Sequence, residues 1–184
     1  MRILNCPLSV LLLVIPANMA SAQDVTGVPP AVVASWSQLI GEWKVAGQVG
    51  SSSVTGSACF EWADGRHCYL GRQVWKIGDS GRNVHLALVG GWDAAEKATV
   101  EQGFSSAGGA ATVRYQPPTE DANVIEGSID GVSGPNARWA GTVKLEHNGP
   151  SEFQLTTKVN GETVHSLGFT RKQADSSSKR ESHR

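Results

Sequence analysis

The sequence lacks the motifs that mark most catalytic and metal sites. Its five histidines are dispersed, and none lies two or four residues from another, so no local pair could hold a metal ion. Gly-x-Ser-x-Gly and Cys-x-x-Cys are both absent, which argues against a nucleophile elbow and a redox-active pair. The carboxylates that alternate with apolar residues are expected on the solvent side: Glu61, Glu101, Glu126 and Asp130. We therefore predict no catalytic residue and no metal site.

An excess of one charge and long apolar runs are missing too. The chain has 16 lysines and arginines against 17 aspartates and glutamates, and its basic residues do not cluster within the expected domain. This distribution argues against nucleic acid as a partner. The apolar run at residues 8–15 is far shorter than the ~20 residues needed to cross a bilayer, so we expect no membrane span. The sequence leaves the oligomeric state open.

Residues 1–22 have the three regions of a secretory signal peptide. Arg2 supplies a positive charge, residues 8–15 are apolar, and Ala20–Ala22 are small residues of the kind that signal peptidase reads. We expect cleavage near Ala22, before Gln23, and export to the periplasm or the extracellular space. The alternative is an N-terminal membrane anchor that stays uncleaved.

Cysteine is scarce, with three in the chain, of which Cys59 and Cys68 lie beyond the signal peptide. The residues between them, 61–67, are typical of a hairpin turn that would bring two strands side by side. An even pair of cysteines in an exported protein favours a disulfide, which would stabilise the fold by about 2–3 kcal/mol. The alternative is two free thiols on neighbouring strands.

Glycine, in contrast, is abundant: 21 residues recur between short stretches rich in Val, Thr, Trp and Phe. This rhythm predicts an all-β domain. A short helix over 31–40 is the exception, because apolar residues three to four apart follow Pro29 and Pro30 and stop at Gly41. Successive strands with tight turns favour a single closed, antiparallel up-and-down β-barrel of about 8–10 strands, which removes exposed sheet edges. We place a linker at 23–29, the barrel at 30–172 and a disordered polar tail at 173–184.

The apolar pattern of the last hairpin predicts the register of its two strands. A two-residue turn at Asn160 and Gly161 would put the apolar residues of its two strands on opposite faces. We therefore expect a three-residue turn with Gly161 as a bulge. That turn would pair Leu155 with His165 and Phe153 with Leu167.

The two ends of the expected barrel carry a family resemblance. Leu39-Ile40-Gly41-Glu42-Trp43 after a short helix resembles the Gly-x-Trp start of lipocalins, and the ordered part ends Phe169-Thr170-Arg171-Lys172. With Glu61-Trp62 and Gly91-Trp92-Asp93 between them, the chain is similar to secreted bacterial lipocalin-like, calycin-type barrels grouped as a domain of unknown function. The resemblance implies that Arg171 packs over Trp43 and closes the barrel, a cation–π contact of ~1 kcal/mol. It implies no defined activity.

The aromatic residues indicate a binding site for a small molecule. The candidate ligand contacts are Trp62, Trp139 and His165. Small residues interleaved along the strands would leave room inside the barrel: Gly47, Gly56, Ala58, Gly103, Gly127 and Gly141. Core filling explains the aromatic residues equally well. We expect an exported barrel that binds a small, partly apolar molecule.

Other functions stay open. A packed barrel could contact a protein or a cell-surface polymer through the loops 116–122 and 130–136, and a cofactor-free isomerase or cyclase is a further reading. We expect no cofactor, although haem bound through His165, as in nitrobindin-type proteins, is an alternative; a lone histidine on an apolar face is more often a core residue. His147, beside Asn148 and Gly149, is expected in a solvated turn.

Overall fold

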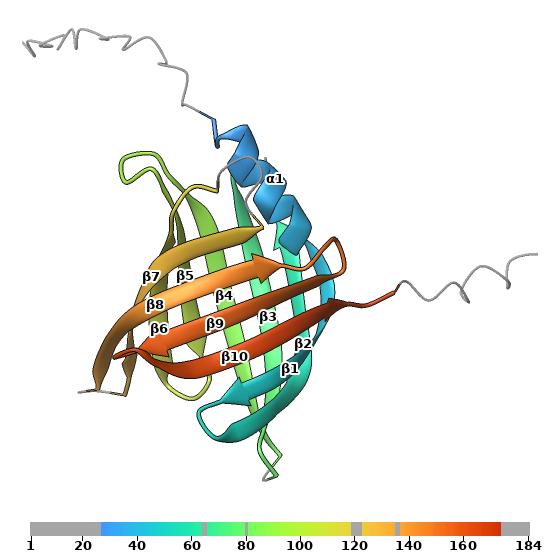
Figure 1. Ribbon diagram of the computed structural model, residues 1–184, viewed down its shortest axis with the longest axis vertical. Helices are drawn as coiled ribbons and strands as arrows, with labels where there is room; N and C mark the ends of the chain where they lie inside the picture. The colour runs from blue at the N-terminus through green and yellow to red at the C-terminus, as the bar shows by residue number, and fades with distance from the viewer. Residues whose placement is uncertain (1–26, 64–65, 80, 119–122, 135–136, 174–184) are drawn as a thin grey trace, which may run out of the picture.

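The computed structural model describes residues 27–63, 66–79, 81–118, 123–134 and 137–173. In these residues one helix precedes ten strands, and each strand pairs antiparallel with its neighbours in the chain while β1 pairs with β10 (Figure 1). The elements are α1 (Pro30–Leu39), β1 (Gly41–Val49), β2 (Ser52–Trp62), β3 (Cys68–Ile77), β4 (Arg82–Asp93), β5 (Ala98–Ser105), β6 (Gly109–Tyr115), β7 (Val124–Ser133), β8 (Arg138–His147), β9 (Glu152–Val159) and β10 (Glu162–Arg171). The predicted closed up-and-down barrel is confirmed. The predicted signal peptide (1–22) and nearly all of the predicted tail lie outside the described residues.

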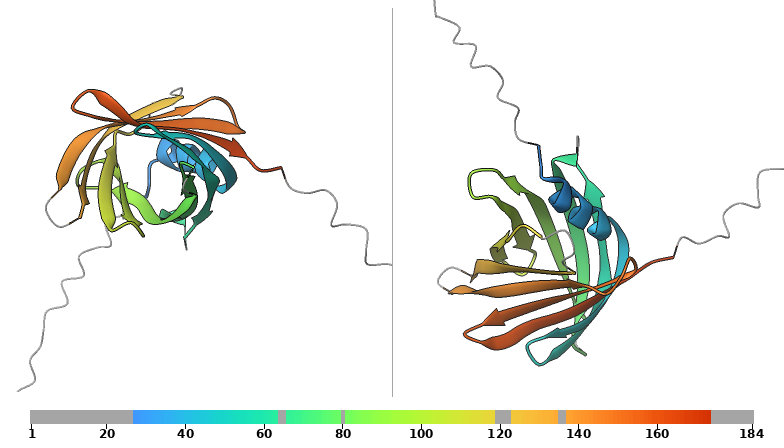
Figure 2. Two further views of the ribbon diagram at one scale, coloured as in Figure 1. Left: turned by 90° about the horizontal axis from the view of Figure 1, so that it is seen from below. Right: turned by 45° about the horizontal axis from the view of Figure 1, so that its top comes forward.

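Helix α1 covers one end of the barrel, which we call the helix end (Figures 1 and 2). Pro30 starts the helix with its backbone dihedral already set, and the periodic side chains Val32, Trp36 and Leu39 are buried. The Trp36 ring packs 6.1 Å from Trp62 and 5.4 Å from Tyr69, measured between ring centroids. The predicted short helix is confirmed, and it closes this end with apolar contacts.

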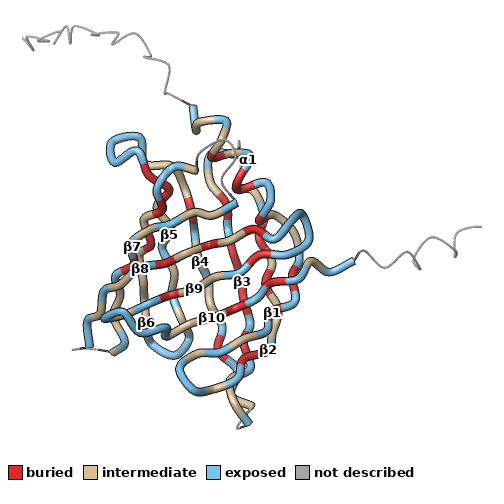
Figure 3. Tube along the Cα trace, in the orientation of Figure 1, coloured by how far each residue is buried: buried red, intermediate tan, exposed pale blue. Residues whose placement is uncertain are grey.

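The interior is filled at the helix end and less tightly filled toward the opposite end, which we call the far end. At the helix end the inward side chains of Trp43, Phe60, Tyr69, Phe153 and Phe169 are almost inaccessible. Each such burial contributes about 1.5–3 kcal/mol. Figure 3 shows buried, half-buried and exposed positions alternating along the strands. Toward the far end, several inward side chains are only half-buried: Leu86, Leu88, Ala111, Trp139, Leu155 and His165. The barrel is therefore asymmetric along its axis.

Four of the glycines expected to leave room inside do not. A Cβ at Gly47, Gly56, Gly127 or Gly141 would collide with a backbone carbonyl oxygen of the neighbouring strand. These glycines allow neighbouring strands to approach and bend around the barrel, which is a common use of glycine in closed sheets. At Gly103 a Cβ would meet Leu88 Cβ at an ordinary 3.7 Å, so that position does leave space.

The register expected for the last hairpin is wrong by two residues. Leu155 pairs with Leu167 and Phe153 with Phe169, after a two-residue turn. Asn160 adopts the left-handed conformation (φ 53°) beside Gly161 (φ 82°), which gives a turn whose twist matches the strands. The register shift lies instead between Thr163 and His165 and returns the apolar residues to one face.

The predicted disulfide is also wrong. Cys59 pairs with Arg72, whereas Cys68 lies opposite Ala63, whose N–H donates to the Cys68 carbonyl. The two cysteines are thus displaced along the sheet by about 13 Å at ~3.3 Å per residue. A disulfide needs Cα atoms about 4.4–6.8 Å apart. Both are free, half-buried thiols because the hairpin is centred nearer to Cys68 than to Cys59.

Candidate functional site

The helix end is tied together by Arg171 and Trp43. The Arg171 Cζ lies 4.2 Å from the Trp43 ring centroid, and the guanidinium donates hydrogen bonds to the carbonyls of Ile40 (2.7 Å) and Gln38 (2.8 Å). Trp43 Nε1 donates to the Leu39 carbonyl at 2.7 Å. The last strand, the first strand and the final carbonyls of the helix therefore meet at one point, which is a structural role.

The structure does not bring the three candidate ligand contacts together. Trp62 lies at the helix end against Trp36. Trp139 and His165 lie toward the far end, on β8 and β10. Trp139 Nε1 donates to Ser133 Oγ at 3.1 Å, and the His165 ring lies 6.4 Å from the Trp75 ring. Trp62 thus packs against the helix that closes the barrel, whereas Trp139 and His165 lie in the less tightly filled far-end half.

His165 points into the barrel. It shares its face with buried Leu167 and pairs with Val49 on one side and with buried Thr157 on the other. Burial lowers the pKa of His165, which favours the neutral imidazole.

One inward carboxyl group was not predicted from the sequence. Glu101, midway along β5, accepts a hydrogen bond from the Tyr69 hydroxyl at 2.8 Å. Burial raises the pKa of Glu101, and the Tyr69 hydrogen bond offsets part of that rise. The pKa values of Tyr69 and Tyr115 are also raised well above their usual value, mainly by burial and then by the nearby Glu101 charge. We call these three residues the interior polar cluster.

The prediction that Glu101 lies on the solvent side is wrong, whereas Glu61, Glu126 and Asp130 are exposed as expected. The apolar alternation of β5 misled the prediction, because exposed Phe104 faces outward while Thr99 and Glu101 face inward. The neighbouring strand β6 contains a residue that could have indicated the inward orientation of Glu101. Tyr115, which is inward, pairs with Thr99 and so places Glu101 on the same inner face.

The surroundings of the cluster differ on its two sides. Toward the helix, a pocket of 20 Å³ lies between the helix and the barrel, with Trp36, Tyr69, Thr99 and Tyr115 among its lining residues. That volume fits a single water molecule. Toward the far end, half-buried Leu88 follows Glu101 along the inner wall. Within the described residues, Glu101 Oε1 has no protein hydrogen-bond donor, so this oxygen is available to another molecule.

His147 is not in a solvated turn, which corrects that prediction. It ends β8 opposite Phe153, is 6% exposed, and its ring lies 6.0 Å from the Phe153 ring. Its Nε2 is buried and has no hydrogen-bond partner among the described residues, and burial lowers its pKa. The side chain follows Val143 and Leu145 onto the inner face because β8 extends two residues beyond Leu145.

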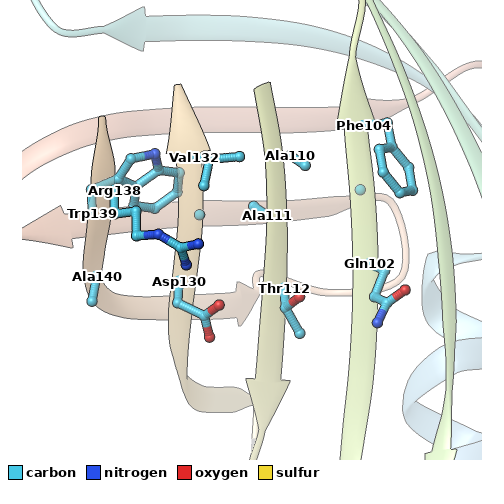
Figure 4. A pocket seen from close by; sticks show the side chains of 12 residues that line it. Gln102, Phe104, Ala110, Ala111, Thr112, Asp130, Val132, Arg138, Trp139 and Ala140 are labelled. Carbon is cyan, nitrogen blue, oxygen red and sulfur yellow. The ribbon is translucent and has the colours of Figure 1, made fainter. Parts of the chain in front are cut away.

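A second candidate region lies on the outer wall. A pocket of 580 Å³ crosses β5 to β8 (Figure 4), and most of its lining side chains face outward, although the inward residues Ala111 and Trp139 also line it. Its lining combines apolar and polar side chains, including Phe104, Ala110, Val132, Thr112 and Arg138. No group of three or more potential metal ligands occurs among the described residues, and none of their helices is long and apolar enough to cross a membrane.

No protein-family model and no curated protein matches the sequence. Among solved structures, the crystal structure of Rv2717c from M. tuberculosis is similar at 14% identity with a TM-score of 0.56, over 79% of this chain and 99% of that one. A de novo designed fluorescence-activating β-barrel matches at 15% identity with a TM-score of 0.43, over 72% and 93% of the two chains. The redesigned barrel mFAP0 bound to DFHBI matches at 9% identity with a TM-score of 0.43, over 73% and 99%. The likeness to Rv2717c shows the barrel fold alone.

Proposed function

We propose that the protein binds a small, partly apolar molecule in the far-end half of its interior, with Glu101 meeting the polar group of the ligand. The observation that carries this proposal is a carboxyl group turned into the barrel, for which Tyr69 is the one protein hydrogen-bond partner among the described residues. Removing a carboxylate from water costs free energy unless it is paired, so an interior that served only as packing would gain from an apolar residue at this half-buried position. Such perturbed groups concentrate at functional sites.

The inward, half-buried side chains of the far-end half indicate the chemistry of the proposed ligand. Leu86, Leu88 and Leu155 offer apolar surface, and Trp139 offers an aromatic ring toward the far end. Glu101 accepts hydrogen bonds when ionised, so the ligand carries an N–H donor such as an amine at one end of an apolar body. The plug at the helix end leaves the far end as the side from which the ligand enters.

Dansylcadaverine, an aromatic dye with a primary amine, is a suitable probe. Its affinity is measured by the rise in dye fluorescence for the wild type, for Glu101→Gln and for Glu126→Gln, a control at an exposed carboxylate on β7. We expect Glu101→Gln to weaken binding about tenfold, which corresponds to ~1.4 kcal/mol, and Glu126→Gln to leave it unchanged. The glutamine retains an oxygen for the Tyr69 hydrogen bond, so the fold is preserved. Equal binding by wild type and Glu101→Gln, or no binding of the dye, contradicts the proposal.

Haem binding through His165 is the second candidate, favoured by the inward, neutral imidazole. The Trp75 ring and Thr157 lie beside it, so a haem would have to displace Trp75. Adding haemin to the purified protein tests this candidate. The absence of a shifted Soret band, or a band that survives His165→Ala, removes it.

An enzyme would need an inward polar group with a shifted pKa, and Glu101 meets that condition. A carboxyl and a phenol in one hydrogen bond do not define a reaction, so we assign no catalysis.

We also infer export from residues 1–22. N-terminal sequencing of the protein from the extracytoplasmic fraction is expected to begin at Gln23, and an intact Met1 there would contradict cleavage.

A further inference from the structure

One row of residues crosses the 580 Å³ pocket of the outer wall, near the far end of β5 to β8. Phe104 pairs with Ala110, which in turn pairs with Val132. Val132 pairs with Arg138. Residues directly opposite one another in a sheet share a face, and Phe104, which is 63% exposed, faces outward. All four side chains therefore project from the outer wall, and we call these four residues the outer row.

The two ends of the outer row carry different chemistry. Phe104 offers an exposed aromatic ring at one end, and Arg138 offers an exposed guanidinium at the other (Figure 4). The smaller side chains of Ala110 and Val132 lie between them. The ends are three strand spacings apart, which amounts to about 14 Å. An elongated molecule with an apolar body and one anionic end matches this row.

The charge of Arg138 is available to such a molecule. Among the described residues Arg138 makes no ion pair. Asp130, in the adjacent row of the pocket, instead meets Arg114 at 2.9 Å, and Arg114 also meets Glu96 at 3.2 Å. The Arg114 charge offsets the repulsion between Asp130 and an anionic ligand. A guanidinium can bind a carboxylate through two parallel hydrogen bonds, so a carboxylate is the group expected at this end of the row.

The size of the pocket favours an organic molecule over a simple anion. Ligand pockets commonly measure about 300–1,000 Å³, and 580 Å³ lies within that range. An inorganic anion at Arg138 would leave the aromatic end of the pocket, at Phe104, unused. Gln102 and Thr112, which pair with each other in the adjacent row, add hydrogen-bonding groups beside the body of the ligand.

We propose that the outer row binds an aromatic carboxylate, whose ring packs against Phe104 and whose carboxylate meets Arg138. This site differs from the proposed interior site in the charge that it selects, because Glu101 favours an amine whereas Arg138 favours an anion. The proposal does not rest on interior binding, since Phe104 and Glu101 point to opposite sides of β5.

Dansylglycine, which combines the fluorophore of dansylcadaverine with a carboxylate, is the probe. Its affinity is measured by the rise in dye fluorescence. Arg138→Gln is expected to weaken binding about tenfold, through the loss of a charge-assisted hydrogen bond. Phe104→Ala is expected to weaken binding about fivefold, through the loss of an aromatic contact. Lys44→Gln, which removes one positive charge at an exposed position on β1, is the matched control and is expected to bind as the wild type does.

Circular dichroism verifies that the variants fold, and because Phe104 and Arg138 are exposed, their replacement removes little core packing. A wild type that does not bind dansylglycine overturns the proposal. So does binding by Arg138→Gln or Phe104→Ala that equals binding by the wild type. A loss in Lys44→Gln as large as that in Arg138→Gln would indicate a general attraction of the dye to positive charge, and would overturn it as well.

Discussion

At the scale of single residues, Glu101 and His147 respond to pH in opposite ways. Burial raises the pKa of Glu101, so between its unfolded value of about 4.3 and the higher folded value the native state binds more protons. The stability contributed by this group is therefore lost as pH rises through that window. Burial lowers the pKa of His147, so its contribution is lost as pH falls below about 6.5 toward the folded value.

Replacing Glu101 isolates the contribution of its carboxyl group to the pH dependence of the unfolding free energy. Glu101→Gln removes the ionisation of a buried group, so the variant gains stability relative to the wild type as pH rises from 4 to 7. Urea denaturation at several pH values measures the difference in unfolding free energy. A constant difference across that range would show that the carboxyl group is not buried in the native state.

His147→Leu is expected to have a different signature. The variant removes the unpartnered Nε2 and is expected to stabilise the protein by about 1 kcal/mol at pH 7, within the usual cost of an unsatisfied buried group. It also loses less stability than the wild type on acidification from pH 7 to pH 5, because leucine cannot take up a proton. Melting temperatures at the two pH values measure both effects; identical pH dependence in the two proteins would contradict the buried position.

At the scale of elements, the helix end depends on the junction of α1, β1 and β10. Arg171→Met removes the hydrogen bonds to Ile40 and Gln38 and the cation–π contact, and is expected to cost about 2–4 kcal/mol in urea denaturation. Lys172→Met breaks an exposed pair with Glu42 and is expected to cost less than ~1 kcal/mol. Similar losses in the two variants would show that Arg171 is no more than a surface charge.

The register of β2 with β3 predicts the state of the thiols. Denaturing without reductant and alkylating with iodoacetamide is expected to label both Cys59 and Cys68. Mass spectrometry of the peptides reports the labels. A linked Cys59–Cys68 peptide that appears only before reduction would contradict this register.

Much of the architecture could be predicted from sequence periodicity. The helix and the barrel follow from apolar spacing, glycine rhythm and turn residues. Registers could not, because a turn at Asn160 or between the cysteines has several lengths that differ little in local preference. Glu101 was missed because β5 places Phe104 on the outside, so the apolar pattern of that strand points away from the core.

At the scale of the whole molecule, the two ends of the barrel differ in how tightly their interiors are packed. The helix end is packed with aromatic rings and tied by Arg171, which is where stability is concentrated. The far-end half has half-buried inward side chains, among them Leu88 and His165.

The central claim is that a ligand enters the far-end half and meets Glu101. The most direct measurement is the NMR shift of the tryptophan indole N–H groups on adding dansylcadaverine. Trp75 and Trp139 lie toward the far end, whereas the other four tryptophans, Trp36, Trp43, Trp62 and Trp92, lie at the helix end. We expect shifts at Trp75 and Trp139 that are lost in Glu101→Gln, with the helix-end signals unmoved. Shifts confined to the helix-end tryptophans, or none at all, would contradict it.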